Sequence, residues 1–391
     1  MTDDTAGSVP QKHSRRRTLL IALLLLLLLV AGLLVWVLLP GDGSDDSDSP
    51  LREDLNRSAE LLRGAPALHY TGTIKVKGQE DARVDLIVDN PGDGLGTLAK
   101  PDGPAVDYVG VDGKSYLRGD TEAWQGLGMA SASKVLAKDP RRVAPGVFFR
   151  KDLAGVLAPP ALAKTLLFED VPDKKITAGD PVEAGDHTCT PVHADGMTVC
   201  LGEKVKGDAR FVDRVTFPGK SLVLDIEPMS RKAVREFSRD FRSTLPLTYE
   251  AVDDQIDVTN QILRDYKGKC APTACTFRSR TTVTYLGSAA APEAAKDVRV
   301  RYAWVMKRDG RTVKVGPGCS GTLLIKPGRS KDLACTATGS SVPAGQTSGQ
   351  YSGAIHTSDF ALTKAEYEDV LRLAADNAEK VEDLHDLPAV D

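Results

Sequence analysis

The segment LHYTGTIKV, residues 68–76, decides the fold class of the first half of the chain. Its side chains alternate between apolar and polar types, and successive side chains of an extended backbone point to opposite faces. One face therefore carries Leu68, Tyr70, Ile74 and Val76, and the other face is polar. This alternation predicts a strand with one buried face and one face in water.

The same pattern recurs after short breaks. Val84, Leu86 and Val88 repeat the pattern beside Arg83, Asp85 and Asp89, and the apolar residues of 106–111 lead into Asp112-Gly113. An Asp-Gly pair is typical of a two-residue hairpin turn. The segments therefore predict an antiparallel meander, which continues in further strands at 187–192, 197–201, 211–217 and 222–226.

Between these two groups of strands, residues 129–168 carry apolar pairs at helical spacing, and prolines interrupt them. Because proline ends or kinks a helix, this pattern predicts several short helices. The order of strands, short helices and strands predicts an α+β fold, with one sheet and its helices on one face.

Three of these segments carry a family resemblance. Residues 68–76, the run VGVDGKSYL at 109–117 and the run RVTF at 214–217 make residues 51–228 similar to actinobacterial envelope lipoproteins of the LppX and LprG type, which share the LolA-like fold. The resemblance implies a curved half-barrel with helices around an apolar cavity for acyl chains. The side chains expected to line it are Leu68, Tyr70, Ile74, Leu86, Tyr108, Leu153, Leu157, Leu166, Phe168, Phe211 and Phe217. The lipidated cysteine of that family is missing here.

The amino-terminal region predicts a membrane anchor. Residues 19–39 are apolar and uncharged, and a helix of this length matches the ~30 Å hydrocarbon core of a bilayer. Basic residues in 1–18 and an acidic linker at 40–50 predict an N-inside orientation, so 1–18 is a cytoplasmic tail and the bulk of the chain is extracellular. A cleaved signal peptide is the alternative, although its apolar region is usually shorter.

The cysteines agree with an extracytoplasmic location. All six follow the apolar run, which is typical of an oxidising compartment. Their short separations favour pairing between sequence neighbours: Cys189 with Cys200, Cys270 with Cys275, and Cys319 with Cys335.

The remainder predicts connecting helices at 229–267 and a second domain at 268–391. Strands around the Asp309-Gly310 turn, with Arg308 opposite Arg311, suggest a sandwich. Together with the cysteines, residues 268–360 resemble disulfide-pinned immunoglobulin-like modules of exported actinobacterial proteins. Thr363 and Glu366 form the capping box of a final helix, which we expect to close this domain.

Catalytic and metal chemistry find little support in the sequence. Ser131 and Lys134 match a Ser-x-x-Lys motif, but its companion motifs are missing. His187, Cys189, His193 and Cys200 offer zinc ligands, but their spacing lacks the tight Cys-x-x-Cys pair, and a disulfide is simpler in an oxidising compartment. We therefore expect no catalytic residue, no metal and no cofactor.

The charge composition of the chain bears on the kinds of partner that it can bind. The chain has 50 basic and 54 acidic residues and a net charge of −4, which argues against phosphate-neutralising binding of nucleic acid. The sequence predicts a membrane-anchored, extracytoplasmic, non-catalytic binding protein for an apolar or acylated envelope molecule, such as a lipid or an acylated glycan. The alternative is a structural, adhesion or scaffolding ectodomain that contacts other envelope proteins and has no ligand cavity.

Overall fold

A computed structural model describes residues 49–75, 81–143, 152–184, 187–205, 209–263, 274–286, 296–338 and 351–384. The chain divides into two compact units, Met1–Ser49 and Pro50–Asp391. All described residues except Ser49 belong to the second unit.

A 13-stranded sheet, counted over the described residues, organises what we call the first lobe. It runs in the order β13-β6-β5-β4-β3-β2-β1-β12-β11-β10-β9-β7, and β8 also pairs with β9. The strands are β1 (Ala67–Ile74), β2 (Ala82–Asp89), β3 (Gly94–Ala99), β4 (Ala105–Val111), β5 (Lys114–Arg118), β6 (Arg141–Val143), β7 (Thr177–Ala178), β8 (Val182–Ala184), β9 (His187–Ala194), β10 (Met197–Lys204), β11 (Arg210–Thr216), β12 (Leu222–Pro228) and β13 (Val252–Asp253).

Strand register follows from the alternation in the sequence. Tyr70 on β1 lies opposite Leu86 on β2 and Ile226 on β12, so one face of three neighbouring strands is apolar. Asp112 and Gly113 both have positive φ angles, 52° and 65°, as the tight turn between β4 and β5 requires. The predicted meander is thus present, from β1 to β5.

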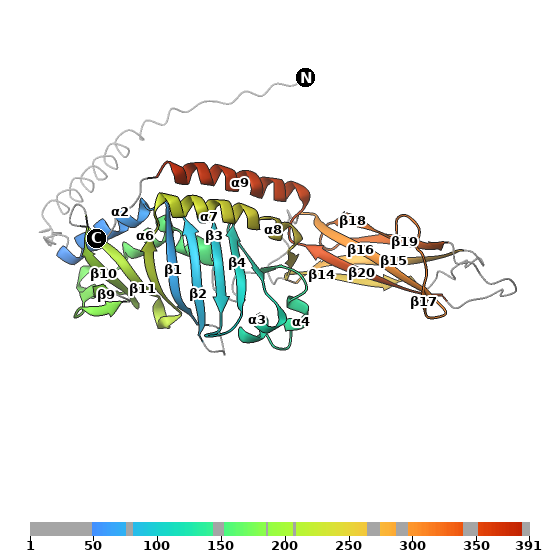
Figure 1. Cartoon of the computed structure of the whole chain (residues 1–391), viewed down its shortest axis with the longest axis horizontal. Coiled ribbons are helices and arrows are strands. Elements are labelled where there is room, and N and C mark those ends of the chain that lie inside the picture. Colours follow the sequence, from blue (N-terminus) through green and yellow to red (C-terminus); the bar gives the residue numbers. More distant parts are fainter. Residues whose placement is uncertain are drawn as a thin grey trace, which may run out of the picture. The chain divides into compact units, whose positions relative to one another are not determined.

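Helices cover both faces of this sheet (Figure 1). On one face α2 (Pro50–Arg63), α5 (Leu153–Leu157) and α6 (Pro159–Leu166) share the main hydrophobic core with the strands. On the other face α7 (Arg231–Thr244) and α9 (Lys364–Glu382) pack with residues of β4 and β5, among them Val109 and Tyr116. Two short helices, α3 (Thr121–Gly126) and α4 (Ser133–Leu136), lie between β5 and β6 in sequence, and α8 (Pro246–Glu250) follows α7.

Two smaller sheets form what we call the second lobe, residues 256–360. One sheet has the order β14 (Ile256–Ile262), β15 (Ala274–Tyr285) and β19 (Ser330–Thr338). The other places β16 (Val298–Arg308) between β20 (Tyr351–Phe360) and the pair β17 (Arg311–Thr312) and β18 (Ser320–Ile325). Trp304 and Met306 from one sheet pack with Phe277 and Leu333 from the other, so the two sheets form a sandwich.

The second lobe is inserted into the first. The chain leaves the first lobe after β13 and returns to it through α9, and the backbone N–H of Ala361 donates to the carbonyl of Ala251 at 2.7 Å. The two crossing points of the chain are therefore adjacent.

The predicted α+β fold class is wrong. Strands account for 45% and helices for 29% of the structure, and the helices of the first lobe cover both faces of the large sheet instead of one. Within the described ranges, no helix is both long enough and apolar enough to cross a membrane. The predicted tail at 1–18, membrane helix at 19–39 and nearly all of the linker at 40–50 lie outside those ranges.

Two predicted helices also need correction. A connecting helix was expected through Val252 and Ile256, but these residues begin β13 and β14. All seven residues of β14 pair with β15, and this pairing stabilises the segment as a strand. The final helix begins at the predicted capping box, Thr363 and Glu366, yet it packs on the first lobe and not on the second. Its apolar stripe covers a sheet face that would otherwise be open to water.

Candidate functional site

The side chains predicted to line an acyl-chain cavity lie together in the first lobe. Phe217 packs against the edge of the main core, and the other ten belong to it and are at most 7% exposed. The hydroxyl of Tyr70 donates to the carbonyl of Leu157 across this core. These ten side chains therefore pack against one another: Leu68, Tyr70, Ile74, Leu86, Tyr108, Leu153, Leu157, Leu166, Phe168 and Phe211.

Two of the predicted disulfides are present. Cys189 is bonded to Cys200 with a Cα–Cα distance of 5.4 Å, and Cys319 is bonded to Cys335 with a Cα–Cα distance of 4.7 Å. Cys275 is disulfide-bonded as well, whereas Cys270 lies outside the described residues. Across the described part of the chain, no group of three or more His, Cys, Asp or Glu side chains could hold a metal ion.

The Ser-x-x-Lys match lies at the start of α4. Ser131 and Lys134 are both exposed there, and the hydroxyl of Ser133 donates to the carbonyl of Ala130 at 3.0 Å. Neither Ser131 nor Lys134 is therefore held in the buried arrangement that would activate a serine nucleophile.

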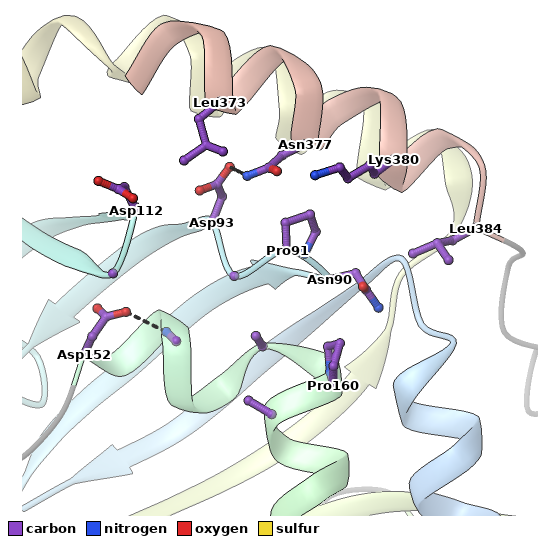
Figure 2. A pocket seen from close by; sticks show the side chains of 15 residues that line it. Asn90, Pro91, Asp93, Asp112, Asp152, Pro160, Leu373, Asn377, Lys380 and Leu384 are labelled. Atoms are coloured by element: carbon purple, nitrogen blue, oxygen red, sulfur yellow. Dashed lines mark hydrogen bonds between the residues drawn. The ribbon is translucent and has the colours of Figure 1, made fainter. Parts of the chain in front are cut away.

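A pocket of about 690 Å³ lies where four segments of the first lobe meet (Figure 2). The β2–β3 turn, the β4–β5 turn, the start of α5 with α6, and helix α9 each contribute part of its wall. Carboxylates come from Asp93, Asp112 and Asp152, and apolar surface comes from Pro91, Ala158, Pro160, Ala161, Leu373 and Leu384. Because α9 supplies one wall, the pocket exists only when the C-terminal helix has docked on the sheet.

The β2–β3 turn is held by its own side chains. The carboxylate of Asp89 accepts from the backbone N–H groups of Gly92 at 3.0 Å and Asp93 at 2.7 Å. The amide of Asn90 donates to the carbonyls of Arg63 and Ala65, both at 2.9 Å, and so ties the turn to the end of α2. These bonds fix the backbone of the turn from which the Asp93 side chain projects.

Two glycines allow helix α5 to lie close to the sheet, and an N-cap residue holds its first turn. A side chain at Gly94 or Gly110 would meet the methyl group of Ala154, because a Cβ there would lie 2.9 or 2.6 Å from it. The N-cap residue Asp152 accepts from the N–H of Gly155 at 2.8 Å and from the hydroxyl of Ser115 at 2.8 Å. The Asp152 carboxylate is thus held at the pocket wall by uncharged donors.

Asp93 connects the turn to α9. Its side chain is 2% exposed, and its Oδ2 accepts from the amide of Asn377 at 3.0 Å. Burial raises the pKa of Asp93 from 3.8 to about 6; the nearby Asp112 carboxylate contributes to this rise, while the Asn377 hydrogen bond opposes it. A buried carboxylate with neutral partners therefore faces the pocket.

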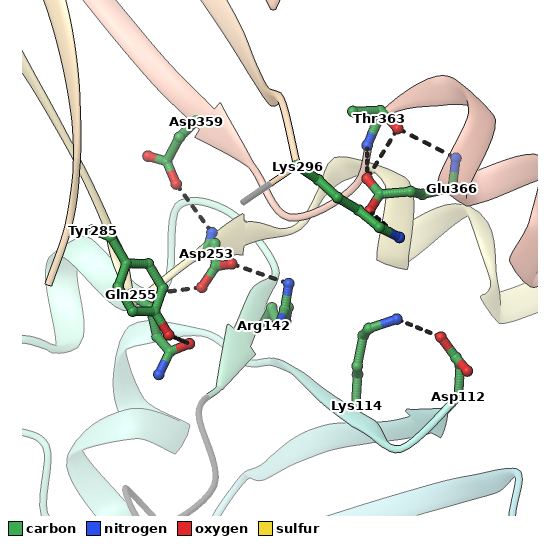
Figure 3. A network of polar contacts seen from close by, with 10 residues as sticks. All are labelled: Asp112, Lys114, Arg142, Asp253, Gln255, Tyr285, Lys296, Asp359, Thr363 and Glu366. Atoms are coloured by element: carbon green, nitrogen blue, oxygen red, sulfur yellow. Dashed lines mark hydrogen bonds and ion pairs between the residues drawn. The ribbon is translucent and has the colours of Figure 1, made fainter. Parts of the chain in front are cut away.

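A second polar network joins the two lobes (Figure 3). Arg142 on β6 pairs with Asp253 on β13 at 3.1 Å, and the N–H of Asp253 donates to Asp359 on β20 at 3.1 Å. Lys296 pairs with Glu366 of the α9 capping box at 3.1 Å. All these side chains have partners within the fold, so we interpret this network as structural.

Sequence reasoning missed the pocket because its parts are far apart in the chain. Asn377 carried the one local signal. It lies in the apolar stripe of α9 between Ala374 and Val381, and all three are buried. A polar residue at such a position needs a buried partner, and that partner is Asp93, 284 residues away.

Comparison with known proteins gives neither a family nor a curated relative, since no family model and no curated protein matches the chain. A structure of the MucA/MucB complex of Pseudomonas aeruginosa matches with 11% identity and a TM-score of 0.24, over 76% of this chain and 96% of that one. A structure of MucB in complex with periplasmic MucA matches with 13% identity and a TM-score of 0.23, over 75% and 94%. Neither is an LppX- or LprG-type protein or an immunoglobulin-like module, and scores this low carry no inference about this chain.

Proposed function

We propose that this chain is an extracytoplasmic, non-catalytic binding protein that takes a segment of a partner polypeptide into the pocket under α9. The observation that carries the proposal is the pocket itself, which combines a carboxylate wall with the apolar surface of Pro91, Pro160 and Leu373. A polypeptide segment offers both charged and apolar side chains, and binding sites combine apolar lining with a few placed polar groups. The two disulfides support the extracytoplasmic location, because such bonds persist in oxidising compartments.

An acyl chain, the ligand expected from the sequence, remains a prediction that rests on the LppX and LprG resemblance. The side chains that would contact it, such as Leu68, Tyr108 and Leu157, are fully buried against one another. An acyl chain would have to separate them, at the cost of their packing contacts. The pocket under α9 is formed without any such rearrangement, and for this reason we favour a polypeptide.

Photo-crosslinking tests the proposal. In cells that make the full chain, p-benzoyl-phenylalanine is placed at Ala161 in the pocket or, as a matched control, at Ala375 on the exposed side of α9. We expect a protein adduct from position 161 and none from position 375. The purified partner should then lose affinity for an Ala161→Trp variant and keep it for Ala375→Trp. Equal crosslinking from the two positions, or unchanged affinity of Ala161→Trp, would contradict the proposal.

A further inference from the structure

The charge balance of the pocket points to one class of ligand group. Asp112 forms an ion pair with Lys114 in its own turn. Among the described residues, Asp93 and Asp152 form no ion pair; their partners are the neutral donors described above. The pocket wall thus holds two carboxylates that form no ion pair within the described residues, and Lys380 is the one basic side chain among the residues that line the pocket.

Asp93 has fewer hydrogen-bond partners than Asp152. It is 2% exposed, and the only hydrogen bond to its carboxylate within the described residues goes to Oδ2, which leaves Oδ1 unpartnered beside the pocket. A hydrogen bond from a charged donor to a carboxylate is about twice as strong as one between neutral groups. Oδ1 is therefore available to a charged donor that enters the pocket.

The surroundings favour a cation on an apolar stem. Figure 2 shows Pro91, Pro160 and Leu373 around the same space as Asp93. These surfaces suit the methylene groups of a long basic side chain, which buries its stem and presents its charged end. Lys380 is exposed at the α9 wall, where it can donate to a backbone carbonyl of the same ligand.

We propose that the pocket takes a lysine or arginine side chain of the partner polypeptide, with Asp93 Oδ1 as its principal acceptor and Asp152 as a second carboxylate nearby. This inference rests on the proposed function and deepens it. The charged groups that face Asp93 are Asp89 in its own turn, Asp112 on the β4–β5 turn, Asp152 on α5 and Lys380 on α9. Because Asp93 is largely protonated below about pH 6, the attraction for a cation should weaken there.

The test compares two small probes on the full chain by ligand-observed NMR. N-acetyl-lysine N-methylamide carries the charge, and N-acetyl-norleucine N-methylamide has a similar stem without it. We expect the lysine probe to bind at least about tenfold more tightly at neutral pH, as a hydrogen bond to a charged group implies. The preference should fall at pH 5 and disappear in Asp93→Asn, which still binds the norleucine probe, while Asp102→Asn keeps the preference.

The outcomes separate this inference from the proposed function. The cation site would be overturned if both probes bound the unmodified chain equally well. If Ala161→Trp also abolished this binding, the pocket would still stand as a binding site. Binding of neither probe would overturn both proposals. A lysine preference that survives Asp93→Asn would overturn the assignment of Asp93 as the acceptor.

Discussion

Replacement of Asp93 by asparagine should stabilise the protein at neutral pH. The pKa of Asp93 in the folded chain is raised from 3.8 to about 6, so the folded state holds this proton more tightly than the unfolded state. The free energy of unfolding therefore falls as the pH rises from 3.8 to about 6, and the loss persists above pH 6. At about 1.4 kcal/mol per pKa unit, the charged carboxylate costs the folded state about 3 kcal/mol.

Asparagine removes this cost and keeps the contact with α9. Its side-chain oxygen can still accept the hydrogen bond from the Asn377 amide, which is 3.0 Å long in the structure. We expect Asp93→Asn to raise the free energy of unfolding by up to about 3 kcal/mol above pH 6 and to leave it nearly unchanged at about pH 4. Urea titrations at several pH values, followed by tryptophan fluorescence, measure the difference between variant and parent.

The matched control is Asp102→Asn in the exposed β3–β4 turn. Asp102 has a positive φ of 60°, which asparagine also tolerates, and its carboxylate is in water. The control should change the free energy of unfolding only slightly, because the side chain is exposed. If Asp93→Asn followed the parent at every pH, or lowered stability at neutral pH, desolvation of Asp93 would not be the dominant effect and the reasoning would fail.

Three further outcomes follow from the structure. Asp359→Asn should raise the free energy of unfolding above about pH 6 and not at pH 4, because burial raises the pKa of Asp359 to about 6; a pH-independent difference in urea titrations would contradict this. Tyr108→Phe should lower it by about 1–3 kcal/mol, because the N–H of Ala154 loses the hydroxyl that accepts from it at 3.0 Å; an unchanged urea midpoint would argue against that contact. Joint replacement of Cys319 and Cys335 by alanine should cost about 3 kcal/mol for a closed loop of this length, and thermal unfolding with and without reductant checks it.

Local patterns in the sequence predicted local structure well. The Asp309-Gly310 turn places Arg308 opposite Arg311, as expected, because two-residue hairpin turns fix the register of both strands. The capping box of Thr363 and Glu366 is also confirmed, since its reciprocal hydrogen bonds involve only residues within one turn of helix.

Strand β3 escaped prediction because its glycines hide the alternation. Gly94 and Gly96 occupy two of its six positions, and glycine has no strand preference of its own. The structure explains Gly96, where a Cβ would lie 2.1 Å from the carbonyl oxygen of Asp85 on the neighbouring strand. Such a close approach is decided by the paired strand and cannot be read from the segment alone.

The pocket and the packing of α9 needed information that no local pattern holds. The stripe of Val370, Ala374 and Val381 shows that α9 is buried on one side but not which surface covers it. Sequence order favoured the adjacent second lobe, whereas the open face of the first lobe offered Val109 and Tyr116 as partners. Contact with these side chains buries the apolar stripe of α9.

The adjacency of Ala251 and Ala361 has a consequence for how the molecule can be altered. The chain enters and leaves the sandwich at adjacent positions. A short linker between Ala251 and Ala361 would therefore delete about a hundred residues without distorting the first lobe. The sandwich could then be exchanged as one unit, and a replacement would have to supply the contact that Lys296 now makes with Glu366 at the start of α9.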